Sequence, residues 1–187
     1  YRRQRQMCIR DSVRALCFCV DQQHANYMNA KFTLAGLKSA VLTSENSKYR
    51  NIEIKRLAEK KINYLFVVDM FNEGIDIPAI DTVLFLRPTE SLTIFLQQFG
   101  RGLRKAKDKK YLTVLDFVGH SRAEFNYMDR FRALMGRTSM SVKEEVEKDF
   151  PHLPLGCTIQ LEPKAKEYII QNINGYINSF KKTRIIQ

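Results

Sequence analysis

Five short, uninterrupted apolar runs constrain the fold of this chain more than any other feature. Each run is four to eight residues long, which fits a strand better than a helix. Because the runs are continuously apolar, they are typical of parallel strands that helices cover on both faces. We therefore expect all five to be strands buried on both faces. The runs are Ala15–Val20, Ser39–Leu42, Tyr64–Val68, Thr82–Leu86 and Tyr111–Val118.

Amphipathic segments separate the first three runs. Residues 22–35 and 47–61 have the length and charge of crossover helices, and Ser47 is predicted to cap the second one. The resulting order β-α-β-α-β predicts a doubly wound α/β domain with right-handed crossovers. Polar residues follow the carboxyl ends of the strands, where open parallel sheets bind ligands. These residues are Gln22, 43–45, 69–76 and 87–89.

The apolar pattern changes near residue 120. Residues 121–136 are predicted to form a helix, and residues 163–182 a second helical stretch that Gly175 divides. We therefore predict an α/β domain over residues 12–136 and a mostly helical extension over residues 137–187.

The net charge of +11 favours an acidic partner such as nucleic acid. Residues 1–11 contribute +3 of that charge, from four arginines and one aspartate, and show no apolar periodicity. We interpret this segment as non-native or disordered. A basic arm that binds nucleic acid is the alternative interpretation.

Cysteine spacing and hydropathy bear on the location of the protein. Cys17 and Cys19 are two residues apart, so in a strand they share one face, which favours burial over a disulfide. His24 is the only histidine near them, so we expect no zinc site. Reduced thiols and the absence of a membrane-length apolar run predict a cytoplasmic protein.

The segment QQFGRGLR, residues 97–104, carries the most specific pattern. On a helix, Gln97, Arg101 and Arg104 fall on one face. The glycines on either side of Arg101 each cost about 1 kcal/mol in a helix, but they allow another surface to approach. A guanidinium pair with free access is suited to phosphate oxygens. The alternative is a solvated basic face, which would not need the glycines.

These residues match a known family. Gln97, Gly100, Arg101 and Arg104 resemble motif VI of superfamily 2 helicases, and the upstream NEGIDIP, residues 72–78, resembles their motif V. Residues 15–32 are similar to motif IV with its helix, and residues 40–45 to the strand and loop that follow. The resemblance spans residues 13–120 and is closest to the bacterial DEAD/DEAH-box group with restriction-enzyme-type helicase cores.

The resemblance implies a RecA-like parallel sheet flanked by helices. Members of the family sandwich ATP between two such domains, and this chain is similar to the second only. A Walker A motif is absent from the sequence, and Gly36–Ser39 is not a P-loop. The first domain, outside this chain, would therefore hold most of the triphosphate and the Mg²⁺, and this chain alone should be inactive as an ATPase.

The resemblance also implies individual roles. Arg101 and Arg104 would act as catalytic arginine fingers on the γ-phosphate of ATP. No residue is assigned to a metal. The nucleotide would contact Glu73, Gly74, Asp76 and Gln97, and the nucleic acid would contact Thr43, Ser44 and Asn72.

The family resemblance thus predicts the second motor domain of an ATP-dependent helicase or translocase. The predicted partners are the first RecA-like domain of the same chain and nucleic acid, with DNA favoured over RNA, and no membrane. Two alternatives stay open: a non-catalytic module that only binds nucleic acid, and the translocase subunit of a restriction system.

Overall fold

A computed structural model describes residues 13–45, 47–68, 79–87, 111–117, 126–136, 138–153, 155 and 157–185. The chain divides into two compact units, Tyr1–Phe117 and Val118–Gln187, and each is described by itself below.

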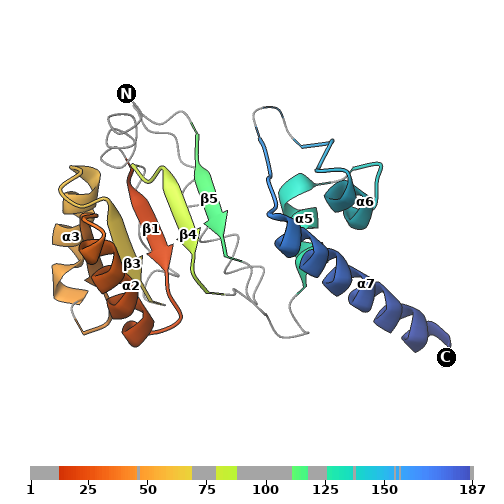
Figure 1. The fold of residues 1–187 in the computed structure, drawn as a ribbon, viewed down its shortest axis with the longest axis horizontal. Coiled ribbons are helices and arrows are strands. Elements are labelled where there is room, and N and C mark those ends of the chain that lie inside the picture. Colours follow the sequence, from red (N-terminus) through yellow and green to blue (C-terminus); the bar gives the residue numbers. More distant parts are fainter. Residues whose placement is uncertain are drawn as a thin grey trace. The chain divides into compact units, whose positions relative to one another are not determined.

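The first unit contains a five-stranded parallel sheet (Figure 1). Its strands pair in the order β2-β3-β1-β4-β5, so the first strand of the chain lies in the middle. Each of the five apolar runs contains one strand, which confirms the five strand predictions. The strands are β1 (Ala15–Phe18), β2 (Ser39–Leu42), β3 (Tyr64–Val67), β4 (Thr82–Phe85) and β5 (Thr113–Asp116).

Burial differs between the inner strands and the edge strand β5. All four residues of β1 and of β4 are buried, as expected for strands with a neighbour on each side. The prediction that Tyr111–Val118 would be buried on both faces is wrong, because Leu115 of β5 is 46% exposed and Phe117, just after the strand, is 58% exposed. A run of apolar residues predicts a strand but does not reveal whether the strand ends up at the edge of its sheet.

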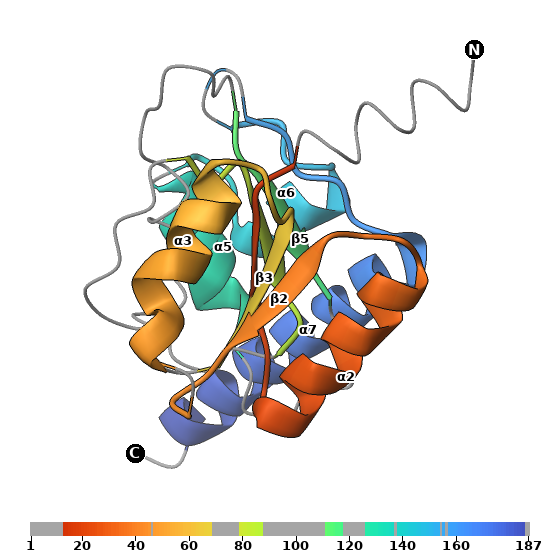
Figure 2. The same ribbon diagram turned by 90° about the vertical axis from the view of Figure 1, so that its left-hand side faces the viewer.

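Two crossover helices flank the sheet, as the periodicity predicted. Helix α2 (Gln22–Leu34) connects β1 to β2, and a 3₁₀ turn η1 (Ser47–Tyr49) followed by α3 (Arg50–Ala58) connects β2 to β3. The two crossovers run in opposite directions along the strand order. Two crossovers of the same hand that run in opposite directions place their helices on opposite faces of the sheet, and Figure 2 shows α2 and α3 on opposite faces.

The two helices begin differently but end alike. Asp21 caps α2 by accepting a hydrogen bond from the His24 amide at 2.7 Å. The prediction that Ser47 caps the next helix is wrong, since Ser47 begins η1 and the residue before α3 is Tyr49. Both helices end in a left-handed residue, Gly36 after α2 and Lys60 after α3.

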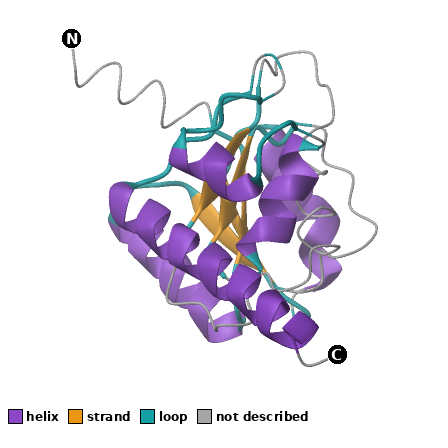
Figure 3. Cartoon of the chain, turned by 90° about the vertical axis from the view of Figure 1, so that its right-hand side faces the viewer, coloured by secondary structure: helices purple, strands orange, loops and turns teal. Residues whose placement is uncertain are grey.

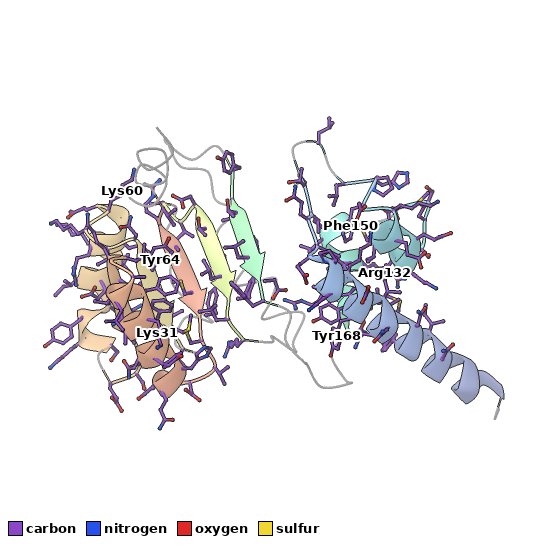
Figure 4. All side chains as sticks on the ribbon, viewed as in Figure 1. Lys31, Lys60, Tyr64, Arg132, Phe150 and Tyr168 are labelled. Carbon is purple, nitrogen blue, oxygen red and sulfur yellow. The ribbon has the colours of Figure 1, made fainter. Side chains whose placement is uncertain are left out.

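The face of the sheet under α2 has an aromatic core. Phe32 of α2 meets the rings of Tyr64 and Phe66 edge-on, at centroid distances of 4.9 and 5.0 Å (Figure 4 labels Tyr64). Cys17 and Cys19 are buried in the same cluster and form no disulfide, as their spacing predicted. On the opposite face Phe18 and Phe85 stack at 5.6 Å. Side chains from neighbouring strands therefore hold the sheet together on both faces.

Polar side chains fasten the end of the sheet where the strands begin. We call this end, residues 13–15, 38–39, 62–64, 80–82 and 111–113, the amino edge. The Asp81 carboxylate accepts hydrogen bonds from the Arg14 amide at 3.0 Å and from Arg14 Nε at 3.3 Å. The buried Asn63 donates from Nδ2 to the Val13 carbonyl at 2.9 Å. These contacts link residues beside β1 to β4 and to β3.

The described residues of the second unit form three helices, and Figure 3 colours all described helices purple. The three helices of this unit are α5 (Tyr127–Met135), α6 (Val142–Glu147) and α7 (Pro163–Ile185). Helix α5 contacts both α6 and α7, although the sequence assigned residues 121–136 to the α/β domain. The prediction that Gly175 divides the last helix is wrong, because α7 continues through it. One glycine costs a helix only about 1 kcal/mol, and apolar packing of Ile169 and Ile173 offsets that.

Aromatic and aliphatic side chains together form the core of the second unit. Phe131 packs against Phe150 with ring centroids 5.1 Å apart, and Tyr127 meets Tyr168 edge-on at 6.2 Å (Figure 4 labels Phe150 and Tyr168). The fully buried Glu145 carboxylate lies 2.8 Å from His152 Nδ1. The second unit, which includes α5, thus has its own packed core.

Candidate functional site at the carboxyl edge of the sheet

Parallel strands bring the residues that follow them to one edge of the sheet. We call this end the carboxyl edge, and in the described residues it consists of 19–22, 43–45, 68, 86–87 and 117. The sequence predicted ligand binding here, because the carboxyl ends of parallel strands leave a crevice at such an edge.

The loop after β2 presents one of its two predicted phosphate contacts to solvent. Ser44 is exposed, whereas Thr43 is only 5% exposed. Gln22, the first residue of α2, donates a hydrogen bond from Nε2 to Ser44 Oγ at 3.2 Å. The exposed hydroxyl is therefore oriented from the start of α2, and Ser44 is the more accessible of the pair.

Hydrogen bonds between residues close in sequence span the loop after β2 and the loop before α2. The Ser47 amide donates to the Ser44 carbonyl at 3.4 Å, which closes the turn into η1. Before α2, the Val20 amide donates to His24 Nδ1 at 3.3 Å. Both connections on this side of the carboxyl edge are thus ordered by contacts between residues three or four positions apart.

Burial and two nearby charged residues set the pKa of the Cys19 thiol at this edge. Burial raises the pKa of Cys19 to about 12, the guanidinium of Arg87 opposes that shift, and the carboxylate of Asp21 adds to it. Arg87 follows β4 and Asp21 follows β1, and these strands are neighbours. Opposite charges from two strands therefore act on the same position, and the thiol between them stays neutral.

The other predicted site residues lie outside the described residues. This group holds both predicted arginine fingers and the predicted nucleotide contacts, together with one nucleic-acid contact. They are Asn72, Glu73, Gly74, Asp76, Gln97, Arg101 and Arg104. Their roles stay predictions.

Still, the described strands fix where the two motif segments leave the sheet. The segment with Asn72 to Asp76 begins after Val68, and the segment with Arg101 and Arg104 begins after Arg87. Both departure points belong to the carboxyl edge, on strands that flank β1. The described part of the site and the start of both motif segments therefore share one edge.

Sequence reasoning missed the contact of Gln22 with Ser44. Gln22 was noted as a polar residue after a strand, but no role was assigned to it. The two residues are 22 positions apart, and no periodicity connects them. A signal was present, since a long amide side chain at the first position of a helix points back toward the preceding loops.

Among the described residues, no group of three His, Cys, Asp or Glu side chains is placed to hold a metal ion. None of the helices described there is both long and apolar enough to cross a membrane.

A family model matches residues 3–106 of the chain. The family is the Helicase conserved C-terminal domain, and the match covers more than half of the 187 residues. It includes the described loops at Gln22 and Ser44 and both motif segments.

Individual proteins agree with the family match. The chain is 33% identical over 107 residues to the protein named "Putative ATP-dependent helicase IRC3" from Saccharomyces cerevisiae, which is 57% of this chain and 16% of that protein. It resembles the solved structure of the E. coli DEAD-box protein SrmB, with a TM-score of 0.50, 27% identity, and coverage of 58% and 62% of the two chains.

A further solved structure is a fragment titled as a "putative HsdR subunit of a type I restriction enzyme" from Vibrio vulnificus. Here the TM-score is 0.52 and the identity 25%, over 68% of this chain and 27% of the other. The chain matches less than a fifth of the length of the curated relative. The parallel sheet and its flanking helices have the RecA-like fold found at the C-terminal side of superfamily 2 helicase cores. On these grounds the chain belongs to the helicase conserved C-terminal domain family.

Proposed function

We propose that this chain is the second motor domain of an ATP-dependent helicase or translocase. One observation carries the proposal: the exposed Ser44 and the departure points of both motif segments lie on the same edge of the sheet. A nucleotide and a nucleic-acid strand at this edge would be bound by neighbouring loops. Closure of the two domains around ATP would then change their affinity for the nucleic-acid strand.

In this proposal Arg101 and Arg104 neutralise the charge that develops on the γ-phosphate during hydrolysis. A finger arginine accelerates turnover about 10³- to 10⁵-fold in well-characterised GTPases. Gly74 allows the backbone to approach the nucleotide, since glycine has no Cβ. Asp76, Glu73 and Gln97 complete the nucleotide contacts.

Mg²⁺ would be held mainly by the first domain, which lies outside this chain. Bound Mg²⁺ neutralises phosphate charge. This chain would supply arginines and backbone contacts, and without a Walker A motif it should not hydrolyse ATP alone.

On the nucleic-acid side, Ser44, Thr43 and Asn72 contact phosphates. Such contacts position a strand without reading its sequence. We propose DNA as the strand, supported by the likeness to a restriction-enzyme subunit. The same likeness favours a second candidate function, the translocase subunit of a restriction system.

The experiment needs the longer protein that joins this domain to a Walker A domain. Arg101→Ala and Arg104→Ala should each reduce nucleic-acid-stimulated ATPase turnover at least a hundredfold while strand binding persists, because they remove charge stabilisation from the transition state only. Lys31→Ala on the exposed side of α2 is the control and should leave turnover unchanged.

Near-normal turnover in both arginine variants would exclude the finger role. Strand binding without any ATPase activity in the unsubstituted protein would point instead to a non-catalytic binding module.

A further inference from the structure

Two exposed tyrosines of the first unit each lie beside a lysine. The ammonium of Lys31 lies 5.3 Å from the Tyr27 ring centroid, and that of Lys48 lies 5.0 Å from the Tyr49 ring centroid. The tyrosines are 59% and 47% exposed. An exposed aromatic ring beside a cation is the combination that binds single-stranded nucleic acid, because the ring stacks on a base and the cation attracts a phosphate.

Only one of the two pairs lies beside the loop that presents Ser44. Tyr49 is the last residue of η1, and the amide of Ser47 in the same turn donates to the Ser44 carbonyl. Tyr27 lies within α2, in its second turn. The two pairs therefore have the same chemistry, but Tyr49 is tied directly to the loop of a predicted phosphate contact.

The local fold does not account for a tyrosine at position 49. This residue precedes α3, and its side chain makes no capping hydrogen bond there. Serine, threonine, asparagine or aspartate would stabilise the start of the helix by about 1 kcal/mol. A half-exposed aromatic ring at this position gives up that stabilisation, which is consistent with a role in binding.

We propose that Tyr49 stacks on an unpaired base of a strand whose phosphate lies at Ser44, with Lys48 pairing to the next phosphate. This inference rests on the proposed function and extends it: the ligand is single-stranded at this point, and its bases add to the affinity. Stacking on a ring tolerates any base, so the contact gives no sequence preference.

The test compares two strands that differ only in their bases. One is a labelled oligothymidine, and the other is the same sugar-phosphate backbone without bases. Binding to the 187-residue chain is followed by fluorescence anisotropy at low salt, where phosphate contacts are strongest. The wild-type chain should bind oligothymidine at least fivefold more tightly than the abasic strand.

Variants assign that preference to one ring. Tyr49→Ala should lower affinity for oligothymidine at least fivefold, as expected for one stacked base, and leave affinity for the abasic strand unchanged. Tyr49→Phe should keep the preference, because the ring remains. Tyr27→Ala is the matched control, because Tyr27 is an exposed tyrosine that also lies beside a lysine, and it should behave as wild type.

Equal affinity of the wild-type chain for the two strands, or an unchanged preference in Tyr49→Ala, would overturn the stacking role while leaving the proposed function intact. Absence of binding to either strand would overturn the nucleic-acid function itself, and the stacking role with it.

Discussion

The amino edge and the carboxyl edge of the parallel sheet differ in whether their polar side chains are bonded within the protein or exposed to solvent. At the amino edge, the Asp81 carboxylate accepts hydrogen bonds from Arg14, and the Asn63 side chain donates one to the Val13 carbonyl. At the carboxyl edge, Ser44 accepts one hydrogen bond from Gln22 and is still exposed.

Such a difference divides stability from function within one sheet. A polar group that is buried and bonded inside the protein cannot be removed without leaving its partner unsatisfied. An exposed hydroxyl can be removed at little cost, since water replaces its partner. The amino edge should therefore be sensitive to substitution in its stability, and the carboxyl edge in its binding.

The largest expected effect on stability comes from Asn63→Ala. This substitution removes the buried amide that donates to the partly buried Val13 carbonyl and should destabilise the first unit by about 1–3 kcal/mol. Native-state hydrogen exchange of the β1 and β3 amides measures the change within this unit. A cost below about 0.5 kcal/mol would erase the contrast between the edges.

The ends of the two crossover helices, beside the amino edge, offer a matched pair of smaller effects. Gly36 has φ +75°, and a Cβ added there meets no atom within 4 Å, so Gly36→Ala should cost about 1 kcal/mol through backbone strain alone. Lys60 has φ 58° in the corresponding position after α3.

Lys60→Gly should therefore stabilise the protein, by about 0.5–1 kcal/mol. Urea unfolding compares the two variants, and shifts of the same sign would contradict the strain argument.

At the carboxyl edge, Ser44→Ala should change the free energy of unfolding by less than about 0.5 kcal/mol, because the hydroxyl is exposed. The same variant should weaken nucleic-acid binding several-fold by the loss of a phosphate contact. Gln22→Ala should weaken binding less, since it removes only the group that orients Ser44. A large loss of stability in Ser44→Ala would place this residue with the amino-edge group.

The smallest expected effect on stability at neutral pH is that of Cys19, a buried residue at the carboxyl edge. Its pKa is raised from 9.0 to about 12 in the folded chain, so between these pH values the unfolded chain has released a proton that the folded chain retains. Stability should therefore fall as pH rises from 9 toward 12. Cys19→Ala should make that fall shallower in urea titrations at pH 9 and 10.5, and an identical slope would contradict the burial of this thiol.

Sequence reasoning found the strands and the first two helices, because apolar runs and amphipathic periods are local signals. The exposure of Leu115 and Phe117 escaped it, since the strand order depends on which distant strand β5 pairs with. The left-handed conformation of Lys60 was also beyond reach, because a glycine would have been expected there.

For the site, the sequence located the edge through the polar residues after each strand. Ser44 came from the family resemblance rather than from its own pattern. The contact with Gln22 needs the spatial proximity of two loops, and that proximity is set by the sheet. Local patterns therefore predict candidate binding loops, and the fold determines which of their side chains lie in contact.

Because β1 lies in the middle of the sheet, both strands that pair with it are synthesised after it. Arg14 is synthesised 67 residues before its partner Asp81, a delay of roughly 3–13 s at usual translation rates. For most of that interval β1 has neither neighbour, because β3 begins at Tyr64 and β4 at Thr82, and unpaired strand edges promote aggregation. A nascent chain of this protein should need a chaperone until β4 emerges.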